Sequence, residues 1–360
     1  MASELKVNTI TEATAGSGIT FAKDIIPATP LSHRNMVING AMQVWQRATD
    51  ITSSDGTNED YTSVDRWALN INAASPGSLD IDRSTDTPAG FGYSQKLKCA
   101  ATGTPSGATQ MWQWRYKIEA QDLQHLNYGS SDAEVMTLSW YMKSVNYTSP
   151  ISFYIHKPDG TGAQYNRSVS PTTSWARYSI TIPANTNSGH TIANDNGNGM
   201  TIGIILSATS GGTYQQTGQS SAWTDSSGGW DYYINDQGNF FSSTSNELYL
   251  TGFQLELGSV ATPFEHRSYG EELARCERYC QKIGLITPSK AREVDRARAC
   301  DVHFKTAMRA NCTVPSISNT DGVSLTISGQ SPDGFHCYYT ATSDGMASGV
   351  NAGTIVTAEL

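Results

Sequence analysis

The side chains of this 360-residue chain that could carry chemistry are mainly aromatic. Trp112 and Trp114 occupy alternate positions of the run 110–116, so on a strand both rings point to one face. We interpret this pair as the core of a β-sandwich or, as the weaker alternative, as part of a ligand-binding face. Amphipathic rings with a polar handle suit stacking on sugars.

A second aromatic group surrounds the Gly/Ser-rich residues 226–229 and consists of Trp223, Trp230, Tyr232 and Tyr233. A long Gly/Ser-rich loop is poorly suited to burying four rings. Core or subunit packing and contact with a glycan therefore both stay open for this group. It is the sharper candidate for a glycan-contacting surface.

Motifs for enzymatic chemistry are absent from the sequence. It lacks Gly-x-Ser-x-Gly, a P-loop, Gly-x-Gly-x-x-Gly before a helix, and His-Glu-x-x-His, and its seven histidines are scattered. A glycosidase pair of carboxylates is a spatial arrangement, which sequence alone does not exclude. We predict that the chain is not an enzyme and needs no cofactor.

Metal binding is also not predicted. Cys276 and Cys280 would lie one turn apart on a helix, and the six cysteines are interpreted as buried thiols in preference to a zinc site or a disulfide. The loop 194–199 is rich in oxygen ligands but lacks the acidic twelfth position of an EF-hand, so a solvated turn is favoured. For Glu256 and Glu265, hydrogen bonds to loop amides are favoured over a structural Ca²⁺.

Composition indicates a turn-rich, all-β protein. Only 16% of the residues are charged, Gly reaches 32 residues, and the length allows two or three domains. The formal net charge of -9 argues against nucleic-acid binding. The first residues do not resemble a signal peptide, and no stretch approaches the apolar length of a membrane span, so no membrane insertion is expected.

Alternating apolar residues predict short antiparallel strands between residues 35 and 262, at 136–142, 151–155, 178–182, 200–206 and 249–257. We expect half-buried strands in a jelly-roll sandwich of about eight strands. Residues 285–360 predict a smaller sandwich of five to seven strands, with a Pro-Asp-Gly turn at 331–334.

A helix is predicted between these two β units. Ser268 and Glu271 have the spacing of a capping box, and Gly284 is a natural stop. The predicted apolar stripe packs against the chain itself or against another subunit, and it consists of Leu273, Cys276, Cys280 and Ile283.

Residues 1–24 form a separate unit of two short alternating runs, followed by a proline-stiffened linker at 25–30. Two such strands are not stable alone, so neighbouring subunits or a larger particle must complete them. We therefore predict an attachment and oligomerisation device, most simply a trimer, whose apolar residues are Leu5, Val7, Ile10, Ile19 and Phe21.

Four segments together resemble tail fibre and other virion-surface proteins of bacteriophages. They are residues 35–47 with Asp65-Arg66-Trp67, residues 254–282, residues 307–315, and the terminal Thr-Ala-Glu-Leu360. The resemblance implies a virion protein, assembled in the host cytoplasm, whose N-terminus binds other virion proteins. It also implies a jelly roll similar to carbohydrate-binding modules, and hence a host-surface glycan as receptor.

Two other functions stay open. One is a purely structural role, such as a head fibre, a decoration protein or a baseplate connector, and the other is a glycan-cleaving enzyme. The expected division of the chain is an attachment unit and linker at 1–34, a jelly roll at 35–267, a connecting helix at 268–284 and a small sandwich at 285–360.

Overall fold

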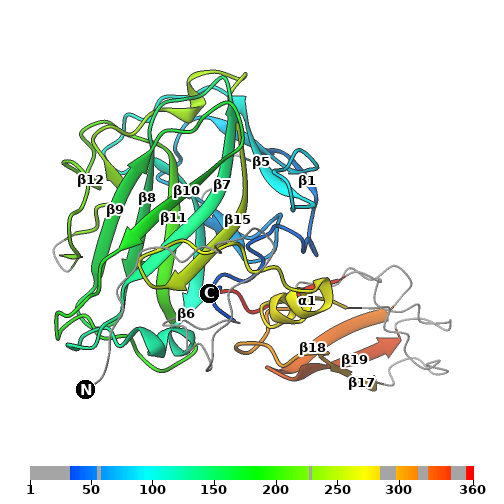
Figure 1. The fold of residues 1–360 in the computed structure, drawn as a ribbon. Helices are drawn as coiled ribbons and strands as arrows, with labels where there is room; N and C mark the ends of the chain where they lie inside the picture. Colours follow the sequence, from blue (N-terminus) through cyan, green and yellow to red (C-terminus); the bar gives the residue numbers. More distant parts are fainter. Residues whose placement is uncertain (1–32, 55–57, 227–228, 284–296, 315–322, 342–353) are drawn as a thin grey trace, which may run out of the picture.

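The computed structural model describes residues 33–54, 58–226, 229–283, 297–314, 323–341 and 354–360. Strands dominate this part of the chain, and the α-helix between them is short (Figure 1). The prediction of an all-β protein with antiparallel sandwiches is therefore confirmed. None of the described helices is long and apolar enough to cross a membrane.

The larger part is a sandwich of two sheets, with six and seven strands instead of about eight in total. The six-stranded sheet contains, in spatial order, β1 (Asp50–Ser54), β4 (Ser78–Ser84), β5 (Ser94–Ala101), β15 (Glu247–Leu257), β7 (Met136–Val145) and β10 (Ala176–Ile182). The seven-stranded sheet contains β13 (Thr224–Asp225), β9 (Ala163–Val169), β8 (Ile151–Lys157), β11 (Asn198–Ala208), β6 (Met111–Glu119), β3 (Trp67–Asn72) and β2 (Asn58–Asp60).

The core lies between these two sheets, and the period-two pattern of the strands selects its residues. On β6, Trp112, Trp114 and Tyr116 all point inward and are buried. Trp114 stacks on Trp67 of β3 with ring centroids 4.2 Å apart, and Phe253 of β15 meets Trp67 at 4.6 Å from the opposite sheet. Large rings from both sheets thus fill the space between them.

The outer face of the seven-stranded sheet is not free, which corrects the expectation of half-buried strands. All residues of β8 are buried, as are all but the terminal residues of β11. The cause is the segment 209–239, which crosses this face and carries the short parallel pair β12 (Gln215–Gln216) and β14 (Tyr233–Ile234). It closes a second small core over the sheet, formed by Met111, Tyr154, Ile205 and Tyr233.

The connecting helix is shorter than predicted. α1 covers Tyr269–Glu277, and the Oγ of its N-cap, Ser268, accepts a hydrogen bond from the Glu271 amide at 3.3 Å. The chain then enters the strand β16 (Cys280–Lys282), which pairs with β20 (Ile355–Thr357). Leu273 is only half-buried, and the buried side chains of the helix are Glu272, Cys276 and Glu277. The predicted four-residue stripe is therefore wrong as a helical feature.

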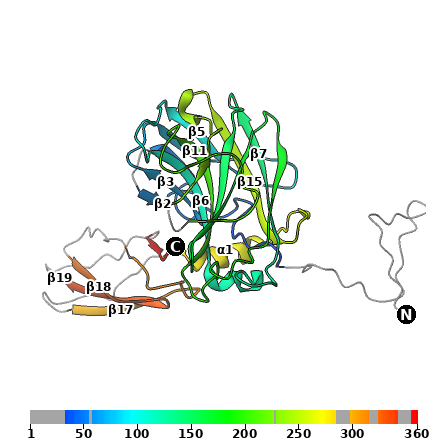
Figure 2. The ribbon, with the colours of Figure 1, turned by 90° about the vertical axis from the view of Figure 1, so that its left-hand side faces the viewer.

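The C-terminal unit has its own core and lies beside α1 at one end of the sandwich (Figure 1 and Figure 2). Its three-stranded sheet has the order β17 (Ala297–His303), β19 (Gly334–Ala341) and β18 (Val323–Ser331). The turn predicted at 331–334 joins β18 to β19. Short 3₁₀ helices at η1 (Ala120–Leu126) and η2 (Phe240–Ser242) complete the described elements.

The two parts meet through buried polar side chains, a region we call the junction. Glu359 accepts hydrogen bonds from Arg47 and Arg66, each at 2.7 Å, and all three side chains are at most 10% exposed. The Arg66 guanidinium also lies 3.3 Å from the centre of the Tyr279 ring and donates to the carbonyl of Lys117 at 2.7 Å.

A second group of junction contacts lies at the base of β6. Arg278 donates two hydrogen bonds of 2.7 Å to the fully buried carboxylate of Glu119, and the Tyr279 hydroxyl donates a third of 2.5 Å. Burial alone would raise the pKa of Glu119, but the hydrogen bonds from Arg278 and Tyr279 hold it below the usual 4.5. The carboxylate therefore stays charged.

The start of the sandwich domain joins the same region. Asn39 is fully buried. Its side-chain Nδ2 donates to the carbonyls of Val44 and Asp65, and its side-chain Oδ1 accepts from the backbone amides of Gln43 and Val44. Arg309 of the C-terminal unit donates to the carbonyls of Ala358 and Glu359. All the segments that carry the resemblance to virion proteins thus supply contacts at the junction.

Candidate functional site

The segment 209–239 is held on the sheet by hydrogen bonds to outward side chains of β9. Asn166 Nδ2 donates to the carbonyl of Asp231 at 2.8 Å, and the Asp231 amide donates to Gln164 Oε1 at 2.9 Å. The Tyr232 amide donates to the carbonyl of Tyr214 at 2.8 Å. These bonds fix the position of the rings that neighbour Asp231.

Those rings form a continuous row across the outer face of the sheet. Tyr232 lies 5.3 Å from Tyr214 and 5.9 Å from Trp230, measured between ring centroids, and Trp230 lies 4.0 Å from His156. Tyr154 packs edge-on beneath Tyr232 at 4.9 Å. His156 and Tyr154 are buried, whereas Trp230 is 42% exposed. The row therefore offers one accessible indole surface on a rigid base.

Gly203 makes room for this arrangement. It lies on β11 next to Tyr154 of β8, and a Cβ at this position would be 1.9 Å from Cε1 of the Tyr154 ring. No side chain fits there unless Tyr154 moves. The glycine therefore determines where Tyr154, and through it Tyr232, can lie.

A hollow of about 190 Å³ opens beside the exposed indole, and we call it the Trp230 hollow. Its lining combines rings with hydrogen-bonding side chains: Arg115, Lys117, Tyr154, His156, Pro158, Asn198, Thr201, Trp230 and Tyr232. A ring face next to amide, hydroxyl and cationic groups can stack on one side of a pyranose and bind its hydroxyls.

The cations of the hollow share one carboxylate. Arg115 Nε donates to Glu59 Oε1 at 2.8 Å, and Lys117 Nζ donates to Glu59 Oε2 at 2.7 Å. Burial alone would raise the pKa of Glu59, but hydrogen bonds from Arg115 and Lys117 lower it. Burial also lowers the pKa of Lys117, against the opposing effect of Glu59. Lys117 Nζ also donates to an oxygen of Leu360 at 2.8 Å, so both cations of the hollow are engaged by partners within the chain.

His156 packs against the Trp230 indole as an uncharged imidazole. Burial, together with the neighbouring Lys157, lowers the pKa of His156 to about 4. The imidazole therefore carries no charge near neutral pH. It presents a flat, uncharged ring to Trp230.

The structure separates the predicted aromatic residues into different roles. Trp112 and Trp114 are 0% and 1% exposed in the main core, so the alternative that they contact a ligand is wrong. Tyr233 is also buried, and its hydroxyl donates to the carbonyl of Thr209 at 2.6 Å. Its assignment to the binding surface is corrected for the same reason: no ligand can reach it.

Trp223 packs mainly inside the chain. Its indole Nε1 donates to the carbonyl of Pro183 at 2.7 Å, and its ring contacts Tyr128 and Tyr165 at the edge of the main core. Of the predicted group, Trp230 and Tyr232 line the hollow and Trp223 does not.

Sequence reasoning missed Arg115, Lys117 and His156. The signal was present, because Arg115 and Lys117 follow Trp114 at positions that alternate with the inward face of β6. His156 alternates in the same way with Phe153 and Ile155 on β8. Considering the residues that alternate with the inward-facing aromatic residues of β6 and β8 would have identified all three.

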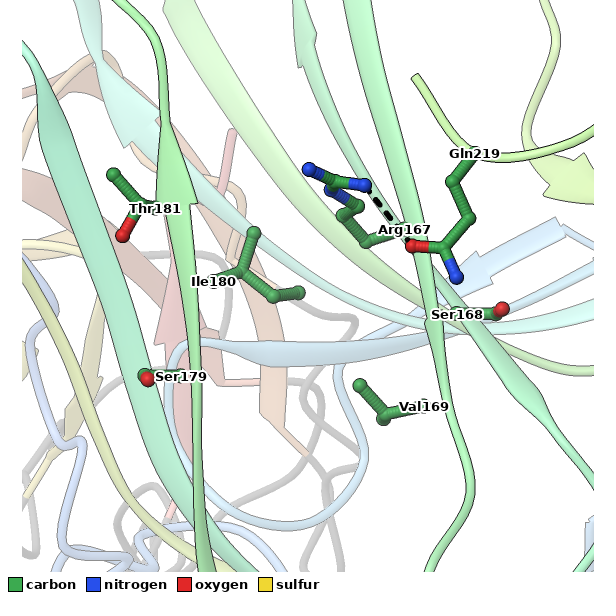
Figure 3. Close-up of a pocket in the computed structure, with 7 residues that line it drawn as sticks. All are labelled: Arg167, Ser168, Val169, Ser179, Ile180, Thr181 and Gln219. Carbon is green, nitrogen blue, oxygen red and sulfur yellow. Dashed lines mark hydrogen bonds between the residues drawn. The ribbon is translucent and has the colours of Figure 1, made fainter. Parts of the chain in front are cut away.

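A larger hollow of about 410 Å³ lies between β9 and β10, on neighbouring edges of the two sheets (Figure 3). Figure 3 shows Arg167 reaching Gln219, with Nη1 3.1 Å from Oε1. The remaining lining is Ser168, Val169, Ser179, Ile180 and Thr181, without an aromatic ring. It therefore lacks a surface for stacking on a sugar.

The other sequence predictions have simpler outcomes. Leu5, Val7, Ile10, Ile19 and Phe21 lie outside the described residues. Glu256 accepts a hydrogen bond from the Thr262 amide at 2.9 Å, and Glu265 accepts one from the Asn35 amide at 2.8 Å. These are the backbone hydrogen bonds that the sequence analysis favoured over a structural Ca²⁺. Within the described ranges, no group of three or more His, Cys, Asp or Glu side chains is placed to hold a metal. Cys99, Cys276, Cys280 and Cys312 are buried free thiols, and Cys337 is also buried.

No protein-family model and no curated protein matches the chain. Solved structures with a similar fold include a family 11 carbohydrate-binding module from Clostridium thermocellum in complex with a mixed-linked tetrasaccharide. This match is 15% identical, with a TM-score of 0.29, and covers 59% of this chain and 99% of the module. A xylan-binding domain from Paenibacillus barcinonensis is 13% identical, with a TM-score of 0.26, and the match covers 61% of this chain and 97% of that domain.

The enzymatically active domain of tailspike protein 4 from bacteriophage CBA120 is 12% identical, with a TM-score of 0.30. That match covers 62% of this chain but only 21% of the tailspike chain. TM-scores of this size are too low for inferring function. The function of this chain has to be inferred from its own residues.

Proposed function

We propose that the chain binds a glycan in the Trp230 hollow. The observation that carries this proposal is the 42% exposed indole of Trp230, held between His156 and Tyr232 beside a hollow lined by hydrogen-bonding groups. Because buried rings support the indole from below, little conformational entropy is lost when a sugar stacks on it. Asn198 and Thr201 also line the hollow, where Asn198 Nδ2 donates to Thr201 Oγ1 at 3.0 Å.

The proposed biological role is adsorption of a bacteriophage particle to its host. The resemblance of the junction segments to tail fibre and virion-surface proteins supports this role. In this proposal the N-terminal unit attaches a homotrimer to other virion proteins, and the sandwich contacts a host-surface glycan. The chain would act by binding and not by catalysis.

The geometry of the hollow also bears on catalysis. Glycosidases place two carboxyl groups on either side of the scissile bond. Among the described residues, no Asp or Glu lines the Trp230 hollow. Glu59 lies next to it but is occupied by Arg115 and Lys117. This arrangement supports a binding site.

The proposal is tested by Trp230→Ala in the full chain. A stacked ring in a binding site contributes on the order of 2 kcal/mol, so binding to host-cell glycans should weaken roughly thirtyfold. Trp175→Ala is the matched control, because Trp175 is a half-buried tryptophan near the six-stranded sheet that hydrogen-bonds Asp86 at 2.9 Å. Unchanged glycan binding by the Trp230 variant, with an unchanged melting temperature, would refute the proposal.

A purely structural role is the second candidate. It is favoured by the internal packing of Trp223 and Tyr233, which shows that the loop 209–239 first serves to cover the sheet. If this role is correct, Trp230→Ala will reduce the yield of assembled particles, while adsorption per assembled particle stays normal. The adsorption and assembly measurements therefore separate the two candidates.

A further inference from the structure

A cluster of aromatic side chains, which we call the Phe91 patch, lies on the outer face of the six-stranded sheet. The ring of Phe91 has three neighbours, with centroids 5.2 Å away at Tyr141, 5.0 Å away at Phe264 and 5.2 Å away at His266. Tyr141 alternates with core residues along β7, so its ring points away from the core. Three of the rings are half-buried, His266 is exposed, and none of the four belongs to a described hydrophobic core.

A bulge in β15 makes room for the Phe91 patch. The pairing of β15 with β7 changes register between Thr251 and Gln254, and Gly252 within this interval has a φ of 68°. A Cβ at Gly252 would lie 2.8 Å from the Phe91 ring and 2.8 Å from the Tyr141 ring. This position therefore requires glycine, both for its left-handed backbone and for the close approach of the rings.

The described chain begins directly beside the Phe91 patch. Glu265 accepts a hydrogen bond from the Asn35 amide at 2.8 Å and another from the backbone amide of His33. In the sequence, Glu265 stands between the two patch residues Phe264 and His266, whose ring centroids lie 4.9 Å apart. The chain that precedes residue 33 is therefore anchored within a few residues of these rings.

We propose that residues 25–31 of the same chain pack on the Phe91 patch. Their sequence, Ile-Ile-Pro-Ala-Thr-Pro-Leu, is uncharged, and its two prolines favour the polyproline II conformation. Surfaces lined with aromatic rings bind such segments, because a proline-rich chain is already extended and loses little entropy on binding. Seven residues in this conformation span about 20 Å, which is enough to reach from residue 33 across the rings.

This packing would give the N-terminal unit a fixed direction. A proline-stiffened linker that contacts nothing sets only the distance between the two parts that it joins. A linker packed on the sheet also sets the orientation of residues 1–24 relative to the sandwich. The inference goes beyond the proposed glycan binding and does not depend on it.

The test is limited digestion of the full chain with trypsin, in which the cut after Lys23 is followed by mass spectrometry. A protease binds several extended residues on both sides of the bond that it cuts, so packing of residues 25–31 should protect this bond. Phe264→Ala should accelerate the cut about tenfold, the effect of losing one aromatic contact, because cleavage follows the population of the open form. Ile26→Ser should have the same effect, and it changes no residue of the described sandwich, so loss of folding cannot imitate the result.

Tyr93→Ala is the matched control. Tyr93 is a half-buried ring near Phe91 in the sequence, but it packs on Arg83, with the guanidinium carbon 4.6 Å from the ring centroid. Its replacement should leave the rate of the cut unchanged. Each rate is divided by that of a free peptide 18–32 with the same linker sequence, which removes any effect of a substitution on trypsin itself.

The double variant decides whether the two surfaces touch. Phe264→Ala combined with Ile26→Ser should be cut no faster than either single variant, because both remove the same contact. Acceleration factors that multiply would overturn the proposal, as would equal rates in all the chains. Protection that disappears on dilution would place the segment on a second copy and would also overturn packing within one chain.

Discussion

Replacing Glu359 by Ala should strongly destabilise the protein, because this side chain is the shared partner of two buried cations. Its carboxylate lies 2.7 Å from Arg47 Nη2 and 2.7 Å from Arg66 Nη1, and these arginine side chains are 8% and 1% exposed. Removing one member of a buried ion pair costs about 3–5 kcal/mol, since the remaining charge stays desolvated without a partner. Among its described ion pairs, Arg47 then keeps the 3.7 Å contact with Asp65.

We expect a loss at the upper part of that range, about 4–5 kcal/mol, because Arg66 has no other carboxylate among its described contacts. The assay is urea unfolding of the full chain, followed by tryptophan fluorescence, which reports on Trp67 and Trp114 in the main core. Arg66→Met in the same background should recover part of the loss, since the stranded charge is then removed.

Glu271→Gln is the matched control. Glu271 forms an exposed ion pair of 3.1 Å with Arg275 on α1, and such pairs contribute about 0.3–0.5 kcal/mol. If Glu359→Ala costs no more than Glu271→Gln, the reasoning about the junction is refuted. Equal effects of Glu359→Ala with and without Arg66→Met would show that the two side chains are not coupled.

Two further predictions rest on described contacts, and a third rests on the sequence of the N-terminal unit. Gly203→Ala should displace the Tyr154 ring, because the added Cβ would lie 1.9 Å from it, and should weaken glycan binding more than it lowers the melting temperature; unchanged binding would contradict the proposed support of the hollow. Arg278→Gln should destabilise the protein near neutral pH. The folded pKa of Glu119 is lowered, so its contribution is present above about pH 4.5 and is lost as the pH falls through the folded pKa. The difference from the unmodified chain in unfolding free energy should therefore shrink in acid, and a constant difference would contradict this assignment. Deleting residues 1–24 should abolish incorporation into particles while leaving a folded remainder, and normal incorporation would rule out the attachment role.

Local signals predicted the start of α1 correctly, whereas its end required long-range information. Ser268 and Glu271 meet within one turn, so their spacing alone indicates the N-terminus of the helix. The helix ends early because Cys280 and its neighbours pair with residues 355–357, far away in the sequence. Tyr279 in addition is held against Arg66. No periodicity within the helix reveals either partner.

Of the rings predicted to form a binding surface, the structure leaves Trp230 exposed and Tyr232 partly exposed. Alternation predicted correctly that Trp112 and Trp114 share a face, but it does not tell which face is covered. Tyr233 became buried because its own loop folds onto β8 and β11. Trp230 stays exposed at the edge of the same loop. Which ring remains accessible is thus decided by tertiary packing.

The junction and the hollow place different demands on the sequence. At the junction, Glu359, Arg66 and Glu119 are buried charges, and each requires its partner in place because an unpaired buried charge costs several kcal/mol. At the hollow, Trp230 is 42% exposed, so we expect its replacement to cost less stability than the loss of a buried junction charge. A resemblance carried by junction residues predicts how the two parts are joined, and under the proposed glycan-binding function the choice of ligand would rest with the residues of the hollow.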